Sequence, residues 1–78
     1  MPVLRLFASA REAAGTTRDT VPAGTVASVL TEAVQRYGSA FEALLPTCRI
    51  WVNGEQADAS TVVADGDEMA VLPPVSGG

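Results

Sequence analysis

The clearest candidates for chemistry are the last six residues, Pro73-Pro74-Val75-Ser76-Gly77-Gly78. Proline fixes φ and lacks an N–H group, so Pro73 and Pro74 end a strand and begin a stiff, extended arm. Glycine has no Cβ, so Gly77 and Gly78 can enter a channel too narrow for other residues. We therefore expect the carboxylate of Gly78 to be the reacting group; a frayed terminus is the alternative interpretation.

The side chains for a self-contained catalytic triad cannot be assembled in this chain. The 78 residues include no histidine, which removes the commonest general base and the commonest metal ligand. No Ser-His pair can form, and the single Cys48 excludes an internal disulfide and a cysteine-cluster metal site. We expect Cys48 to be a small buried residue on a strand. The sequence predicts no active site and no bound cofactor of its own.

The composition is that of one small, acidic, folded domain. Hydrophobic residues make up 47% and charged residues 18% of the chain, which is enough apolar material for a core. The formal net charge of −4 argues against nucleic-acid binding, because phosphates would be repelled. No apolar run approaches the roughly 20 residues of a membrane span, and no signal-peptide pattern is present. We expect a cytoplasmic protein that has no membrane partner.

The elements that must position the arm follow from the sequence pattern, beginning with two strands joined by a short helix. Residues 3–8 alternate as a first strand. Residues 9–14 are good helix formers, with Ser9 as the expected N-cap and a glycine after them. Residues 16–21 are rich in β-branched side chains and predict a second strand.

One main helix is predicted after Thr25, which is a suitable N-cap. Its apolar residues are spaced to form one stripe toward a core: Val26, Val29, Leu30, Ala33, Val34 and Tyr37. Gly38 ends this helix. Residues 40–45 predict one further helical turn, which we expect Pro46 to stop.

The second half of the chain predicts a hairpin and a final strand. Residues 49–56 are extended on either side of Asn53-Gly54, a pair that favours a type I′ turn. Residues 57–64 predict irregular structure. Asp65-Gly66-Asp67 predicts a turn. The alternative, a calcium-binding loop, is not favoured because the remaining ligand positions of such a loop are missing. Residues 68–72 form the last strand. Together these elements predict an α+β fold, with a mixed sheet of four to five strands packed on one main helix.

The helix can cover only one face of such a sheet. Alternation predicts the helix-facing positions Leu4, Leu6, Met69 and Val71. Phe7, Trp51 and Leu72 then lie on the opposite face, around the root of the arm. A cluster of large apolar residues there predicts a docking surface for a partner protein. The alternative is that loops fold over this face and bury it.

Two segments and one dipeptide carry recognisable motifs. Residues 4–15 have the sequence Leu-Arg-Leu-Phe-Ala-Ser-Ala-Arg-Glu-Ala-Ala-Gly, and residues 65–78 have Asp-Gly-Asp-Glu-Met-Ala-Val-Leu-Pro-Pro-Val-Ser-Gly-Gly. With Val52-Asn53, they resemble the small, sulfur-carrying subunits of molybdopterin synthase, within the ubiquitin-like β-grasp group of sulfur carriers. The resemblance covers essentially the whole chain. It departs from the group at Val71-Leu72, where relatives often have aromatic residues, and at Gln56, which is polar at an expected apolar contact.

The resemblance implies a β-grasp domain over residues 1–72 and a flexible arm over residues 73–78. It also implies that a ubiquitin-activating-like adenylyltransferase uses ATP to convert the Gly78 carboxylate to an acyl-adenylate. A sulfur donor of the cysteine desulfurase or rhodanese type then supplies persulfide sulfur, and the product is a C-terminal thiocarboxylate.

The resemblance further implies which protein receives the sulfur. The arm residues Pro73, Pro74, Val75, Ser76 and Gly77 would enter the large subunit of molybdopterin synthase. There the thiocarboxylate gives its sulfur to cyclic pyranopterin monophosphate, building the dithiolene of the molybdenum cofactor. The assembly in this group is a heterotetramer, with two small subunits on a dimer of large subunits.

Two alternatives stay open at this point. Carriers that supply sulfur for thiamine or cysteine also end in Gly-Gly, so the same chemistry can serve another pathway. A ubiquitin-like tag joined to lysines of other proteins, or a β-grasp module that only binds a partner, belongs to a different functional class. One added C-terminal residue would leave a binding-only module unaffected.

Overall fold

A five-stranded mixed sheet forms the centre of the fold, in the spatial order β2-β1-β7-β4-β5. The computed structural model describes residues 1–74. The strands of this sheet are β1 Val3–Leu6, β2 Arg18–Thr20, β4 Arg49–Val52, β5 Glu55–Gln56 and β7 Glu68–Leu72. Strands β1 and β7 run parallel, and the other neighbouring pairs are antiparallel. The predicted α+β class and mixed sheet are confirmed.

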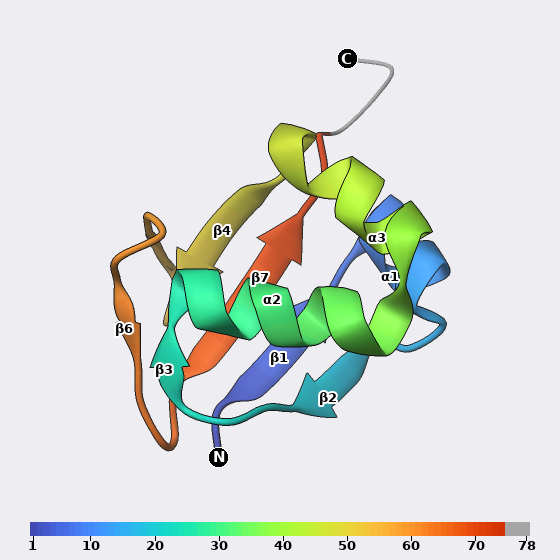
Figure 1. Cartoon of the computed structure of the whole chain (residues 1–78). Coiled ribbons are helices and arrows are strands. Elements are labelled where there is room, and N and C mark those ends of the chain that lie inside the picture. The colour runs from blue at the N-terminus through green and yellow to red at the C-terminus, as the bar shows by residue number, and fades with distance from the viewer. Residues whose placement is uncertain (75–78) are drawn as a thin grey trace.

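Helix α2, Val26–Tyr37, lies across one face of the sheet (Figure 1). A capping box starts it: the Ser28 N–H donates to Thr25 Oγ1 at 3.2 Å, and the Thr25 N–H donates to Ser28 Oγ at 2.9 Å. Gly38 ends the helix with a φ of 93°. The predicted cap and stop of the main helix are therefore confirmed. No helix within residues 1–74 is long and apolar enough to cross a membrane.

The core lies between α2 and the sheet, and it contains the predicted helix-facing positions. Each is at most 2% exposed: Leu4, Leu6, Met69 and Val71. Val26, Val29 and Ala33 of the predicted α2 stripe are also buried. Leu30 and Val34 are only half-buried, although the same stripe includes them. Helix α2 therefore buries a narrower face than its apolar spacing predicts.

The start of the first short helix differs from the prediction. Helix α1 is Ala8–Ala14, and its N-cap is Phe7 rather than Ser9, with no side-chain capping hydrogen bond. Strand β1 ends at Leu6, two residues earlier than predicted. Ala8 takes a φ of 50°, which turns the chain out of the strand and into the helix. Alanine gives no sequence signal for this left-handed conformation.

Two further corrections concern short elements. Helix α3, Ser39–Leu44, is followed by a 3-10 turn, η1, Leu45–Thr47, and Pro46 lies inside that turn instead of stopping the helix. Proline is tolerated there because the first N–H groups of a helix have no partner. Strands β3 Gly24–Thr25 and β6 Val62–Val63 pair as a second small sheet. That pair was missed because two-residue strands have no readable period and their partner is distant in sequence.

The predicted hairpin turn is confirmed, and it is tied to the last strand. Asn53 and Gly54 take φ values of 51° and 81°, as a type I′ turn requires. The Asn53 amide donates to Asp67 at 3.0 Å, and its oxygen accepts the Glu68 N–H at 2.9 Å. The bond from Asn53 is the main cause of a lowered pKa of Asp67. This contact fixes the β4–β5 hairpin against the beginning of β7.

A polar cluster joins the edge strand β2 to the end of α2. Tyr37 Oη donates to Asp19 Oδ2 at 2.7 Å, and Arg36 Nη1 lies 3.1 Å from the same oxygen. Arg36 also contacts Glu32 at 2.8 Å. The hydrogen bond from Tyr37 is the main reason that the pKa of Asp19 is lowered. Arg36 lowers this pKa further, whereas partial burial of the carboxylate raises it.

Tyr37→Phe is expected to lower the free energy of unfolding by about 1 kcal/mol near neutral pH, because one hydrogen bond to a carboxylate is lost. The pKa of Asp19 is lower in the folded protein than in the unfolded chain. The ionised Asp19 therefore stabilises the fold above its pKa in the unfolded chain, and this stabilisation is lost as the pH falls through its pKa in the folded protein. The loss should therefore shrink at about pH 3. Urea unfolding of the wild type and of Tyr37→Phe, at neutral pH and at about pH 3, measures this loss of stability. An equal loss at both would contradict the role of the Asp19 charge.

Candidate functional site

The arm leaves the sheet from its central region. Strand β7 lies between β1 and β4, and its last residue, Leu72, is paired with Arg49 of β4. Pro73, which the sequence assigns to the arm, is buried, and Pro74 is exposed. Of these two prolines, only Pro74 is therefore open to solvent. The predictions for Val75, Ser76, Gly77 and Gly78 lie outside the described residues and stay predictions.

The predicted docking residues lie on the face of the sheet opposite α2, which we call the outer face. Phe7, Trp51 and Leu72 are each half-buried. Trp51 pairs across the ladder with Ala70, two residues before Leu72 on the same face of β7. Phe7 directly follows Leu6, which pairs with Val71.

Register thus brings Phe7 and Leu72 to the same edge of the sheet, at the root of the arm. Phe7 caps α1 instead of extending β1, and the guanidinium carbon of Arg5 lies 5.4 Å from its ring centroid. Gln56, opposite Trp51 on β5, is exposed. The docking role of Phe7, Trp51 and Leu72 stays a prediction.

Cys48 is not on a strand and is only half-buried, so the expectation of a buried strand residue was wrong. It follows the 3-10 turn η1, and its Sγ donates to the Leu44 carbonyl at 3.2 Å. Partial burial raises the pKa of the Cys48 thiol, because the thiolate is desolvated there. A protonated thiol is a poor nucleophile, so Cys48 is not suited to carry sulfur.

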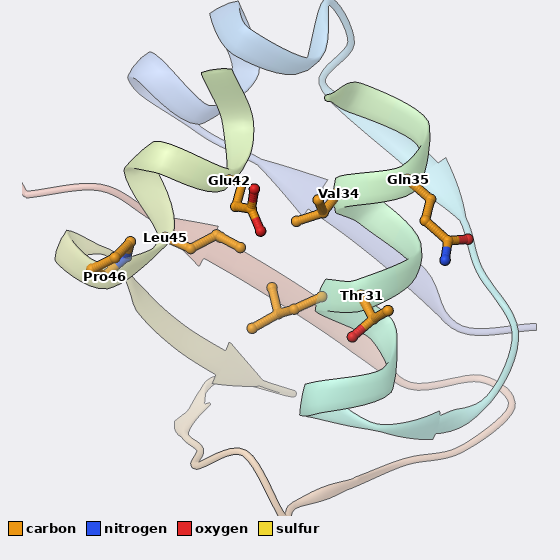
Figure 2. Close-up of a pocket in the computed structure, with 7 residues that line it drawn as sticks. Thr31, Val34, Gln35, Glu42, Leu45 and Pro46 are labelled. Carbon is orange, nitrogen blue, oxygen red and sulfur yellow. The ribbon is translucent and has the colours of Figure 1, made fainter. Parts of the chain in front are cut away.

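Figure 2 shows a groove on the helix side of the sheet that the sequence did not indicate. Val34 of α2 and Leu45 of η1 point toward each other across it. Its volume is about 680 Å³, and its lining is mainly apolar: Leu30, Thr31, Val34, Gln35, Glu42, Leu45 and Pro46. Leu30 and Val34 of the predicted α2 stripe are half-buried rather than buried because they line this groove. Among residues 1–74, its lining contains no cysteine and no serine, and it lies on the opposite side of the sheet from the outer face.

The acidic segment before β7 is a turn, as predicted. Gly66 takes a φ of 85°, and Asp67 accepts the Ala64 N–H at 2.8 Å. With the bond from Asn53, the Asp67 carboxylate is used within the fold. Across residues 1–74, no group of three or more histidine, cysteine, aspartate or glutamate side chains is placed to hold a metal ion.

Comparison with known proteins identifies relatives along nearly the full length. The chain is 36% identical to the molybdopterin synthase sulfur carrier subunit of Pyrenophora tritici-repentis, over 92% of this chain and 84% of that protein. The solution structure of small archaeal modifier protein 1 from Methanosarcina acetivorans matches with a TM-score of 0.88 and 29% identity, covering 99% of this chain and 95% of the other.

One matching structure contains a second subunit. It is the complex of subunits 1 and 2 of the molybdopterin-converting factor from Helicobacter pylori, with a TM-score of 0.71 and 26% identity over 99% of this chain and 97% of the other. The model of the ThiS family matches residues 4–78, a span that includes both terminal motifs. The chain therefore belongs to the ThiS family.

Proposed function

We propose that this protein is a sulfur carrier of the molybdopterin synthase type, with the Gly78 carboxylate as the group that holds the sulfur. The observation that carries the proposal is the family match through residue 78, together with a 36% identical relative named as a sulfur carrier subunit. The exposure of Pro74, two residues after the end of the central strand β7, supports it.

The chemistry needs an activated carboxylate, because the leaving group of a free carboxylate would be oxide. ATP converts the carboxylate to an acyl-adenylate and releases pyrophosphate. A persulfide sulfur then attacks the acyl carbon and displaces AMP. Reduction of the resulting acyl disulfide by a thiol leaves the thiocarboxylate on Gly78.

The groups that stabilise these steps belong to partner proteins. This chain has no histidine, which is the commonest general base, and partial burial raises the pKa of the Cys48 thiol, which makes it a poor sulfur nucleophile. We propose a ubiquitin-activating-like adenylyltransferase as the first partner, with a sulfur donor of the cysteine desulfurase or rhodanese type. All of these steps would take place in the cytoplasm.

The final acceptor in this proposal is cyclic pyranopterin monophosphate, bound by the large subunit of molybdopterin synthase. The structural similarity to one subunit of a two-subunit molybdopterin-converting factor supports a protein partner. The outer face would contact that subunit while the arm enters it.

A second candidate is a ubiquitin-like modifier. The 29% identity and TM-score of 0.88 to small archaeal modifier protein 1 favour it. Both candidates need adenylation of Gly78, but only the modifier forms an isopeptide bond to a lysine of another protein. The absence of lysine here means that the chain cannot be the target of its own conjugation.

ATP–pyrophosphate exchange by the adenylyltransferase is expected to depend on this chain. A variant with one alanine added after Gly78 should lose the exchange, because the carboxylate is displaced by about 3.5 Å. Binding of the large subunit to this variant is the control, since its outer face is unchanged. Undiminished exchange with the extended chain would contradict activation of Gly78. Absence of exchange with both chains, while the large subunit still binds, would favour a module that only binds.

A further inference from the structure

Three of the five arginines line one surface cavity at the end of β1. Arg5, Arg11 and Arg18 surround a volume of about 420 Å³, together with Leu6, Phe7 and Thr17. We call Arg5, Arg11, Arg18 and the space between them the arginine pocket. The volume of the arginine pocket is several times that of one carboxylate group, so the pocket can receive more than one acidic side chain.

The fold, rather than sequence proximity, brings these arginines together. Arg5 on β1 and Arg18 on β2 are direct partners in an antiparallel register. Arg11 reaches the same place because the left-handed Ala8 turns the chain from β1 into α1. Phe7, between these elements, lies 5.4 Å from the Arg5 guanidinium, within the range of a cation–π contact.

The positive charges of the arginine pocket are poorly compensated within the domain. Arg5 is 3.5 Å from Glu68, but these side chains are 46% and 50% exposed, so the ion pair is weak. Across residues 1–74, Arg11 and Arg18 form no salt bridge. Asp19, next to Arg18, faces α2 and is held by Tyr37 and Arg36.

Like charges directly opposite on neighbouring strands destabilise a sheet. The Arg5–Arg18 pair therefore opposes folding, and within the described domain only the exposed Glu68 pair and the Phe7 ring, both at Arg5, offset it. The whole chain has a formal charge of −4, so this local positive charge is also opposite in sign to the average surface. Both facts point to a negatively charged ligand outside the domain.

The arginine pocket is continuous with the outer face. One row across the sheet runs, in register, through Arg18, Arg5, Ala70 and Trp51. Because β1 and β7 are parallel, the pocket at the end of β1 lies at the same edge as Leu72, where the arm leaves. A protein that takes up the arm therefore binds at the edge of the sheet where the arginine pocket lies.

We propose that the arginine pocket receives aspartate or glutamate side chains from an acidic surface on the protein that takes up the arm. This inference rests on the proposed function. Guanidinium groups pair with carboxylates through two parallel hydrogen bonds, which fixes orientation as well as charge. The apolar ring of Phe7 in the lining, and the half-buried Trp51 in the adjoining row, match a protein surface better than a free inorganic anion.

The test is titration of the large subunit of molybdopterin synthase with Arg18→Glu at about 0.05 M and about 0.3 M salt. The matched control is Ala23→Glu/Ala27→Glu, which changes the net charge equally at two exposed positions at the other end of the sheet. We expect Arg18→Glu to weaken binding at least about tenfold at the lower salt and less at the higher, while the control stays within about twofold. Arg18→Lys should be intermediate, because it keeps the charge but not the paired geometry.

Thermal unfolding supplies a second readout that separates docking from structure. Arg18→Glu replaces the like-charge pair with Arg5 by an opposite-charge pair, so its melting temperature should be equal to or above that of the wild type. Weaker binding that accompanies a lower melting temperature would assign Arg18 a structural role and overturn the proposal.

The remaining outcomes are also decisive. Wild-type protein that does not bind the large subunit would refute the proposed function and, with it, this inference. Wild-type binding that Arg18→Glu leaves unchanged would overturn the arginine pocket alone. Saturable binding of inorganic sulfate to the isolated protein, lost in Arg18→Glu while large-subunit affinity is unaffected, would make the pocket a small-anion site and likewise overturn the proposal.

Discussion

Deleting Gly78, or changing Gly77→Ala, is expected to lower sulfur transfer at least about 100-fold, because a shift of about 1 Å at a reacting centre has an effect of that size. The deletion moves the carboxylate by about 3.5 Å along the chain. The substitution adds a Cβ in the part of the arm that we propose enters a narrow channel. Single-turnover transfer from the carrier to its acceptor measures both effects.

The free energy of unfolding should change by no more than about 0.5 kcal/mol in both variants. Strand β7 ends at Leu72, and the hydrophobic core cluster precedes that position. Of the described residues after Leu72, Pro73 is buried and Pro74 is exposed. Ser76→Ala is the matched control, since it alters the neighbouring residue without adding a Cβ, and it should transfer sulfur at close to the wild-type rate. A large loss of stability on deletion of Gly78 would show that the tail is packed structure, and our interpretation of it would be wrong.

Phe7→Ala and Leu72→Ala are expected to weaken binding to the large subunit about thirtyfold, or about 2 kcal/mol, with a modest loss of stability. Both residues are half-buried on the outer face at the root of the arm. Leu6→Ala is the contrasting variant, because Leu6 is only 2% exposed and faces α2. It should lower the free energy of unfolding by about 2–5 kcal/mol.

Calorimetric melting and titration with the large subunit, performed on all three variants, separate the two roles. If Phe7→Ala and Leu72→Ala lose stability as Leu6→Ala does while binding is retained, these residues belong to the core and the docking surface lies elsewhere. Trp51 provides an internal probe, since its fluorescence should shift on complex formation if the outer face is covered. Phe7→Ala also removes the cation–π contact between the Phe7 ring and Arg5.

The parts of the fold that sequence could predict are those with a local physical signal. Thr25 is the predicted N-cap of α2, and Asn53-Gly54 takes the positive φ values of the predicted type I′ turn. The apolar alternation of β1 and β7 identified Leu4 and Met69 as core residues. Each of these features depends on residue type and spacing within a few positions.

The parts that sequence could not predict depend on contacts between distant segments or on an unusual backbone conformation. Ala8 has a φ of 50°, which no alanine pattern signals, and so the start of α1 and the place of Phe7 were mispredicted. Pairing of Val62–Val63 with Gly24–Thr25 is long-range, and neither segment has enough residues to show a period.

The candidate site shows the same division. The resemblance of the terminal motifs predicted the reacting Gly78 and the arm, whereas the arginine pocket depends on the register of β1 against β2. The sequence separates Arg5 from Arg18 by a helix and a turn, and only the ladder places them opposite each other. Alternation predicts which face a residue occupies but not which residue lies beside it.

Intact-protein mass spectrometry after reaction with the adenylyltransferase, ATP and a persulfide donor tests the sulfur-carrier role most directly. Replacement of one oxygen by sulfur has nearly the same mass as oxidation of Met1 or Met69, so the shift must be located by fragmentation. We predict that it appears in C-terminal fragment ions that include Gly78 and lack Met69, and that it requires ATP. A shift that is absent, independent of ATP, or located on Met69 or Cys48 would contradict the proposal that Gly78 carries the sulfur.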